Sequence, residues 1–309
     1  MRLCAVWNPS ERRRVLCVAD DGAGMYPVAL FGDVAELLTS HTGTLESAIA
    51  TAGVSSESLG RYDDLVKSEP DPGALHLVAP VTPAEVWAAG VTYERSRDAR
   101  MHESSEQDVY QRVYDADRPE LFFKATGPRV MGPGAPVGLR ADSSWQIPEP
   151  EIALVLDVES EIVGYTLGND MSSRDIEGEN PLYLPQAKIF SGSCALGPTV
   201  VSAVAIEDPY ALGIEMRIVR GDEPVFTGSM STARLHERFD VLAAYLKREN
   251  WIAPGTVLMT GTGVVPPDEF TLQRGDVIEI SCDPIGVLRN RCEPAEGLAS
   301  PSSWTIPPH

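Results

Sequence analysis

The fold and the candidate site meet in one stretch, SSWQIPEPEIALVLDV at residues 143–158. Its second half contains an unbroken apolar run at residues 152–156, which predicts a buried β-strand. Two acids, Glu149 and Glu151, stand at the entrance to that strand. Because successive strand side chains point to opposite faces, residues two apart share a face. Two carboxylates would therefore lie side by side at the edge of a core, where like charges repel and desolvation is costly.

A hard divalent cation would make this arrangement favourable. Mg²⁺ and Mn²⁺ prefer oxygen ligands, and Mg²⁺ typically binds a few carboxylates together with substrate oxygens. A third ligand is expected from Asp170, which closes a second strand-like segment at residues 161–170. The short turn DVESE between the two segments predicts an antiparallel hairpin. Glu149, Glu151 and Asp170 are therefore candidate metal ligands; alternatively, the glutamates are solvated at a strand end and Asp170 caps a turn.

Composition excludes several classes of protein. The chain has 309 residues and a formal net charge of −20, which argues against binding to a nucleic-acid backbone. No apolar run approaches the roughly 18 residues of a membrane span, and the N-terminus lacks the layout of a signal peptide, so we expect a cytoplasmic protein. The five cysteines include no C-x-x-C pair, which favours ordinary thiols over disulfides or structural zinc.

The predicted fold class is α+β and rich in β-structure. Residues 1–75 indicate a small α/β domain, with strand-like segments followed by two helices. Residues 76–290 are dominated by strand-like segments and form the predicted catalytic domain. Residues 291–309 are rich in Pro and Ser and predict an extended tail.

One long helix is predicted in the second part of the chain, at residues 233–250 with Thr232 as its N-cap. Its apolar side chains recur at helical spacing and form one stripe, made of Leu235, Phe239, Leu242 and Leu246.

Several polar residues could belong to a site. Lys188 could anchor a substrate carboxylate or extend to the surface. Glu120 and Lys124 flank two phenylalanines, as an ion pair or as a general base with a partner that tunes it. Thr262 lies in TGTG after a strand, where glycines would let backbone approach a ligand, or where the chain simply turns. His102 has no partner at the spacing of a metal site or a catalytic triad.

The chain resembles a known family, the fumarylacetoacetate hydrolase superfamily. The resemblance rests on five features that occur in the same order: EPEIALVL, VGYTLGNDMSSRD, Lys188, LGPTVV and PGTVLMTGTG. The resemblance covers residues 80–290. It implies a β-rich C-terminal fold, a smaller N-terminal domain and a homo-oligomer, either a homodimer or a homotetramer. It also implies that Glu149, Glu151 and Asp170 hold Mg²⁺, or Mn²⁺ or Ca²⁺ in its place, and that the substrate is a small 2-oxo acid or β-diketone.

The chain departs from that family in one segment. The C–C bond hydrolases carry a lid of the form G-x-N-Y-x-x-H-x-x-E, whose His–Glu dyad activates water. This chain has AGVTYERSRDA, in which Gly90 and Tyr93 match while Ser96 and Ala99 occupy the His and Glu positions. The resemblance therefore implies no hydrolytic dyad, unless residues 102–103 replace it. We assign Tyr93 and Thr262 to substrate binding.

Three further segments, YDADRPELFFKAT, DSSWQIPEPE and EGENPLYLPQAKIFSG, resemble one branch of the superfamily, the 2-dehydro-3-deoxy-D-arabinonate dehydratases, which also lack the dyad. The likeness implies that Glu120 is a catalytic acid or base and that Lys188 contacts the substrate. The expected reaction is metal-dependent conversion of a 2-dehydro-3-deoxy-pentonate, derived from D-arabinonate or xylonate, to 2,5-dioxopentanoate. This elimination needs removal of a C3 proton and departure of the C4 hydroxyl, and no activated water.

Two alternatives remain at this stage. The same metal platform could serve an acylpyruvate-type C–C hydrolase or an oxaloacetate-type decarboxylase. A metal-dependent protein that binds 2-oxo acids without turnover is the non-enzymatic alternative.

Overall fold

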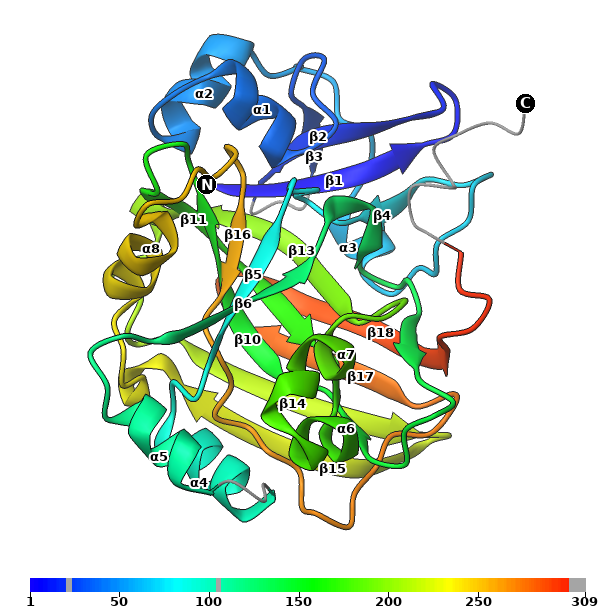
Figure 1. The fold of residues 1–309 in the computed structure, drawn as a ribbon. Helices are drawn as coiled ribbons and strands as arrows, with labels where there is room; N and C mark the ends of the chain where they lie inside the picture. The colour runs from blue at the N-terminus through cyan, green and yellow to red at the C-terminus, as the bar shows by residue number, and fades with distance from the viewer. Residues whose placement is uncertain (21–23, 104–106, 300–309) are drawn as a thin grey trace.

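The computed structural model describes residues 1–20, 24–103 and 107–299. In those ranges most strands belong to one large sheet (Figure 1). Its strands, neighbour by neighbour, are β3 (Met25–Pro27), β2 (Arg13–Ala19), β1 (Arg2–Asn8), β13 (Cys194–Ser202), β11 (Ile162–Asp170), β10 (Pro150–Leu156), β16 (Val257–Met259), β5 (Val86–Gly90) and β6 (Glu120–Ala125). Two more strands pair off this path, β4 (His76–Val78) with β1 and β7 (Val130–Met131) with β13. The α+β, β-rich fold class predicted from the sequence is confirmed.

A second sheet of five strands packs against the large one. Its strands, in order, are β15 (Glu223–Ser231), β14 (Gly213–Arg220), β17 (Val277–Cys282), β18 (Gly286–Pro294) and β8 (Val137–Leu139). Ile152 and Leu154 of β10 share one core with Ile214 and Ile278 of the second sheet. Val155, which points to the other face of β10, belongs to a different core. Strand β10 is thus buried on both faces, which explains its unbroken apolar run.

The helices and the remaining short elements lie around these sheets (Figure 1). The helices are α1 (Val34–Ser40), α2 (Leu45–Ala52), α3 (Tyr62–Leu65), α4 (Glu94–Glu103), α5 (Gln107–Tyr114), α6 (Arg174–Glu179), α7 (Leu184–Lys188) and α8 (Phe239–Lys247). Short 3₁₀ turns are found at Gly127–Arg129, Pro181–Tyr183, Ala203–Ala205 and Thr232–Arg234. A two-stranded pair joins β9 (Gln146–Ile147) to β12 (Ser172–Ser173).

The N-terminal part of the chain is joined to the catalytic part by backbone pairing. Helices α1 and α2 form as predicted, and α1 begins after Asp33, whose side chain accepts from the Glu36 amide. Both helices pack on the large sheet, where Leu37 belongs to the same core as Val155. Strand β1 was not predicted from the sequence; it pairs with β2, β4 and, through Arg2 opposite Val201, with β13. The division at residue 75 stays a prediction, as does the tail from residue 291, although β18 runs on to residue 294.

The predicted start of the long helix is wrong. Helix α8 begins at Phe239, and Thr232 lies in a 3₁₀ turn where its hydroxyl donates to the Pro209 carbonyl. Leu235, predicted as the first member of the apolar stripe, instead forms a β-bridge with Tyr93. The stripe from Phe239 onward is buried as predicted. A backbone partner from a distant segment therefore competes with helix formation before residue 239.

The cysteines and the helices bear on two expectations from composition. All five cysteines are free and buried, which agrees with their interpretation as ordinary thiols. Within the described ranges, none of the helices combines the length and the apolar character that a membrane crossing requires.

Candidate metal centre and active site

The predicted hairpin places three acids together. Strands β10 and β11 pair antiparallel, with Glu151 opposite Gly168, and the Asp170 amide donates to the Glu149 carbonyl at 3.0 Å. The ends of the two strands are therefore aligned, and Glu149, Glu151 and Asp170 each offer a carboxylate oxygen within 4.8 Å of the others. Their exposed fractions are 3%, 1% and 1%, so the alternative of solvated glutamates at a strand end is wrong.

Burial makes this cluster electrostatically costly. The pKa of Glu151 is raised well above its usual value, first by desolvation and then by the negative charges of Asp170 and Glu149. The Gly261 amide offsets part of this cost by donating to Glu151 Oε2 at 2.6 Å. A set of carboxylate oxygens at this spacing suits a hard divalent cation, because positive charge would replace mutual repulsion. The residues present therefore fit Mg²⁺ or Mn²⁺.

Lys188, at the end of α7, lies inside the acidic cluster. Its Nζ is 2.5 Å from Glu149 Oε2 and 3.1 Å from Asp170 Oδ2, and it donates to Ser172 Oγ at 2.6 Å. The side chain is almost fully buried, so the alternative in which it extends to the surface is wrong. A cation held between two carboxylates is well placed to meet a substrate anion.

Two further buried cations complete the cluster and were not predicted as part of it. Arg174, the first residue of α6, brings Nη2 within 3.0 Å of Glu149 Oε1. Lys124 brings Nζ within 2.5 Å of Asp170 Oδ1, so its partner is this aspartate rather than Glu120. For Lys124 the available signal was a lysine inside the apolar run LFFKA, since an unpaired ammonium is rarely buried.

A small cavity of about 20 Å³ adjoins the cluster and gathers most of the predicted site residues. Its lining includes Glu120, Glu149, Glu151, Asp170, Lys188 and Thr262. Tyr93 lies next to this group and is 2% exposed; burial, and then the charge of Glu151, raises the pKa of its phenol. The structure thus brings together residues from five separate segments of the chain.

The Glu120 carboxyl group lies against the backbone of Gly90, which has no side chain. It is the first residue of β6 and pairs with Gly90 at the end of β5. A Cβ added to Gly90 would lie 2.0 Å from Glu120 Oε2, so the carboxyl group occupies the space that any other side chain would fill. The glycine therefore leaves room for the Glu120 carboxyl group at the point where β5 reaches the cavity.

The segment after β5 is linked to the loop that supports the acids. Val91 has φ of +54°, an unusual conformation for a β-branched residue, and it lines the cavity. Next to it, Thr92 Oγ1 donates to the Thr260 carbonyl at 2.7 Å. Gly261, with φ of +88°, passes so close to Thr92 that a Cβ would lie 2.0 Å from its hydroxyl. This close approach positions the Gly261 amide for its bond to Glu151.

Helix α4 brings Ser96 to the cavity. Ser96 is 6% exposed and lines the cavity, and Ala99 is half-buried one turn later. The neighbouring Arg95 fixes the helix by donating from Nη2 to the Val265 carbonyl at 3.0 Å. The side chain of His102 lies outside the described residues, and so does that of Glu103. At the position where the related hydrolases carry histidine, the cavity is therefore lined by a hydroxyl.

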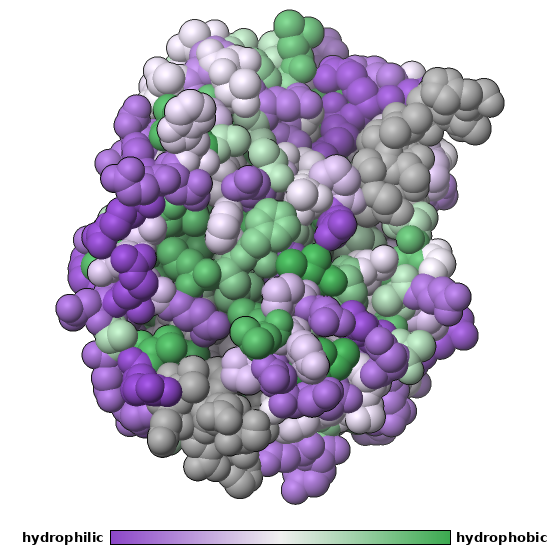
Figure 2. Space-filling model, in the orientation of Figure 1, coloured by the Kyte–Doolittle hydropathy of each residue, from purple (hydrophilic) through white to green (hydrophobic). Residues whose placement is uncertain are grey.

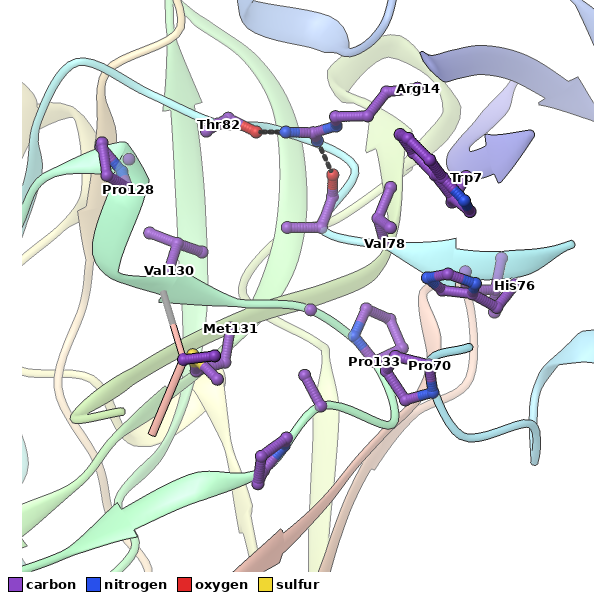
Figure 3. A pocket seen from close by; sticks show the side chains of 17 residues that line it. Trp7, Arg14, Pro70, His76, Val78, Thr82, Pro128, Val130, Met131 and Pro133 are labelled. Atoms are coloured by element: carbon purple, nitrogen blue, oxygen red, sulfur yellow. Dashed lines mark hydrogen bonds between the residues drawn. The ribbon is translucent and has the colours of Figure 1, made fainter. Parts of the chain in front are cut away.

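A larger cavity, of about 260 Å³, lies elsewhere, between the N-terminal strands and the chain around β7 (Figure 3). Trp7, Met131 and several prolines line it, and Arg14 crosses its edge to donate to Thr82 Oγ1 and the Ala79 carbonyl. None of the described residues of the acidic cluster reaches it. The chemistry of the side chains, and not cavity size, identifies the candidate site.

The chain is similar to known dehydratases of 2-keto-3-deoxy sugar acids. The chain is 49% identical over 215 residues to a probable 2-keto-3-deoxyxylonate dehydratase of Haloferax volcanii, covering 70% of this chain and 74% of that protein. It is 43% identical over 231 residues to a 2-dehydro-3-deoxy-D-arabinonate dehydratase of Saccharolobus solfataricus, covering 74% and 77%. A solved 2-keto-3-deoxy-D-arabinonate dehydratase, complexed with magnesium and 2,5-dioxopentanoate, superposes with a TM-score of 0.82 at 35% identity, covering 95% of this chain and 99% of that one.

The family assignment rests on the region that contains the site. The family model of the fumarylacetoacetate (FAA) hydrolase C-terminal domain matches residues 85–293. That range includes both sides of the cavity, from Gly90 and Glu120 to Thr262. The resemblance inferred from the sequence is confirmed: the chain belongs to the fumarylacetoacetate hydrolase family.

Proposed function

We propose that this protein is a metal-dependent dehydratase that converts a 2-dehydro-3-deoxy-pentonate to 2,5-dioxopentanoate. One observation carries the proposal: a single cavity is lined by three candidate metal ligands and by Glu120, while Ser96 stands where the related hydrolases have histidine. This arrangement offers a cation site and a proton-transferring carboxyl group, and it places a hydroxyl where hydrolysis would need a base. The likeness to two dehydratases of 2-oxo-3-deoxy pentonates supports the same reaction.

The residues of the cavity divide the reaction between them. A bound Mg²⁺ supplies positive charge beside the oxygens of a 2-oxo acid, which makes the C3 proton easier to remove. The Glu120 carboxylate accepts that proton and gives a proton to the C4 hydroxyl as it departs as water. Lys188 stabilises the negative charge on the carboxylate and 2-oxo end of the substrate. Elimination leaves a 2-oxo-3-ene that still carries the C5 hydroxyl. Loss of a C5 proton and protonation of C3 convert it to the enol with a C4=C5 double bond, and this enol takes up a proton at C4 as it tautomerises to 2,5-dioxopentanoate.

Two further residues are proposed as substrate contacts. Thr262 lines the cavity, and its hydroxyl can bind an oxygen of the substrate. Tyr93 is buried beside Glu151, at the base of α4, where its ring packs near Gly263. We propose that both define the end of the cavity that receives the hydroxylated part of the substrate.

The proposal is tested by a panel of substrates in the presence of Mg²⁺. We expect a 2-dehydro-3-deoxy-pentonate to yield 2,5-dioxopentanoate, detected as an aldehyde, while acylpyruvates remain essentially uncleaved. In D₂O the product should carry solvent deuterium, because the enol takes its final proton from exchangeable groups. His102→Ala should leave dehydration largely unchanged. Rapid pyruvate release from an acylpyruvate, lost in His102→Ala, would instead identify a hydrolase whose base lies farther along α4.

We also propose that the protein forms a homodimer or homotetramer. Strand β6 is the last strand of the large sheet, and its half-buried side chains include Leu121, Phe122 and Phe123. Figure 2 shows hydrophobic side chains at the centre of the face that carries β5 and β6, surrounded by hydrophilic ones. An edge strand with apolar side chains favours association with another copy. Sedimentation equilibrium should give a multiple of the 33.4 kDa chain mass, and a purely monomeric protein would contradict the proposal.

The remaining expectations concern cell location and partners. We retain the cytoplasmic location and the absence of a nucleic-acid partner as proposals; the likeness to metabolic dehydratases and the strongly acidic composition support them.

A further inference from the structure

Lys124 is one of the largest fully buried side chains among the described residues, with an exposed fraction of 0%. It lies near the end of β6, four residues after Glu120. The pairing of β6 with β5 shifts at this point, where Val86 faces Ala125 and Trp87 faces Phe123, so Lys124 has no partner on β5 and its position is set by its own contacts with the acidic cluster. Moving an ammonium out of water costs several kcal/mol, and that cost is recovered only with excellent geometry.

Lys124 makes two hydrogen bonds and one ion pair. Its Nζ donates to the carbonyls of Met171 at 3.0 Å and Lys188 at 2.5 Å, and it lies 2.5 Å from Asp170 Oδ1 as an ion pair. The two carbonyl bonds fix the path of the main chain, and the ion pair draws Oδ1 towards the ammonium group.

The two oxygens of Asp170 consequently face different partners. Lys124 holds Oδ1, whereas Oδ2 is turned towards Lys188 Nζ, which also contacts Glu149. Oδ2 is thus the oxygen on the side of the other candidate ligands. The bond to the Lys188 carbonyl holds the end of α7, from which the Lys188 side chain reaches the same cluster. One ammonium group therefore links β6, the end of β11 and the end of α7.

We propose that Lys124 is a positioning residue of the metal centre: it orients Asp170 so that Oδ2 faces the cation, and it holds Lys188 beside that cation. The inference rests on the proposed metal site, but not on the identity of the substrate. A positioning role of Lys124 and an effect of its charge alone predict opposite changes in metal affinity. Removing a positive charge near a cation site would strengthen cation binding by Coulomb's law, whereas losing the orientation of a ligand weakens it.

The sign of the change in metal affinity is the test. We expect Lys124→Met, which keeps the apolar stem and removes the three donors, to weaken Mn²⁺ binding by about 10- to 100-fold, the range found when outer partners of metal ligands are removed. Calorimetric titration of the full-length protein with Mn²⁺ alone measures this without any substrate. Turnover at saturating Mn²⁺ should also fall, because Lys188 loses its support.

A control removes a half-buried cation, Arg14, that is remote from the cluster. Arg14 bonds to Thr82, to the Ala79 carbonyl and to Asp33 beside the larger cavity (Figure 3). Arg14→Met should lower the melting temperature while leaving Mn²⁺ affinity unchanged. If Lys124→Met does not fold, Lys124→Gln provides the measurement, since the amide retains two N–H donors without the charge; we expect about a tenfold loss of affinity.

The outcomes separate this inference from the proposed metal site. Weaker Mn²⁺ binding in the Lys124 variants, with normal binding in Arg14→Met, supports the positioning role. Equal or tighter binding in the Lys124 variants overturns it, and leaves the metal site intact. Absence of Mn²⁺ binding in the unmodified protein overturns the metal site, and the inference with it.

Discussion

Exhaustive dialysis against EDTA should abolish turnover of a 2-dehydro-3-deoxy-pentonate, and added Mg²⁺ or Mn²⁺ should restore it. The reason is the buried cluster of Glu149, Glu151 and Asp170, whose carboxylate oxygens lie at the spacing that suits a hard divalent cation. A catalytic cation contributes several kcal/mol, and each 1.36 kcal/mol is tenfold in rate, so the loss should be on the order of 10³-fold or more. The test is the rate of aldehyde formation by the dialysed protein, measured first without metal and then after Mg²⁺ or Mn²⁺ has been added.

Glu151→Gln should reproduce the effect of chelation, because the amide has nearly the same shape but lacks the negative charge. Glu215→Gln, on the exposed face of β14, is the matched control and should retain full activity. Full turnover in the presence of EDTA, or in Glu151→Gln, would rule out the assignment of these acids to a metal centre.

Glu120→Gln should lower kcat by roughly 10²- to 10⁴-fold, the usual contribution of a group that moves protons. The substitution preserves size, and Glu120 is not among the three clustered ligands, so Mn²⁺ affinity should stay unchanged. Steady-state kinetics and calorimetry on the same preparation separate the two effects. Loss of Mn²⁺ binding together with activity would make Glu120 a ligand or a structural partner.

Gly90→Ala tests the role of the Glu120 carboxyl group by changing the residue that this group contacts. The added Cβ would lie 2.0 Å from Glu120 Oε2, so the carboxyl group must move and kcat should fall in this variant too. Gly213→Ala is the control, since a Cβ there meets no atom within 4 Å. Normal kcat in Gly90→Ala would show that the position of the Glu120 carboxyl group is not important for the reaction.

The clustering of the three candidate metal ligands could be predicted from the sequence because their geometry is local. The period-2 alternation of β10 places Glu149 and Glu151 on one face, and the short turn before residue 162 brings Asp170 back beside them. Hairpin pairing alone brings the three acids together, so their proximity can be predicted from the pattern of the residues. The resemblance to the family then assigned catalytic roles to Glu120 and Lys188, whose local context alone favoured an ion pair for Glu120 and a surface position for Lys188.

The partners of the buried cations could not be predicted in the same way. Lys124 meets Asp170 across 46 positions of sequence, and Arg174 meets Glu149 across 25, in each case through contacts between separate elements. The predicted start of α8 was wrong for a related reason, because Leu235 forms a β-bridge with Tyr93, which lies far away in the sequence. Spacing within one element says nothing about such contacts; only the assembled sheet creates them.

The pairing of β1 with β13 has a consequence for how the chain is made. Arg2 stands opposite Val201, so β1 leaves the ribosome about 200 residues before this neighbour does. At the usual 5 to 20 residues per second, that interval is about 10 to 40 s. Strand β4 can pair with residues 5–7 of β1 soon after it is made, but until β13 follows, the end of β1 at residues 2–3 is an open edge that is prone to pair with other nascent chains. The large sheet therefore cannot be completed before residue 201 has been synthesised.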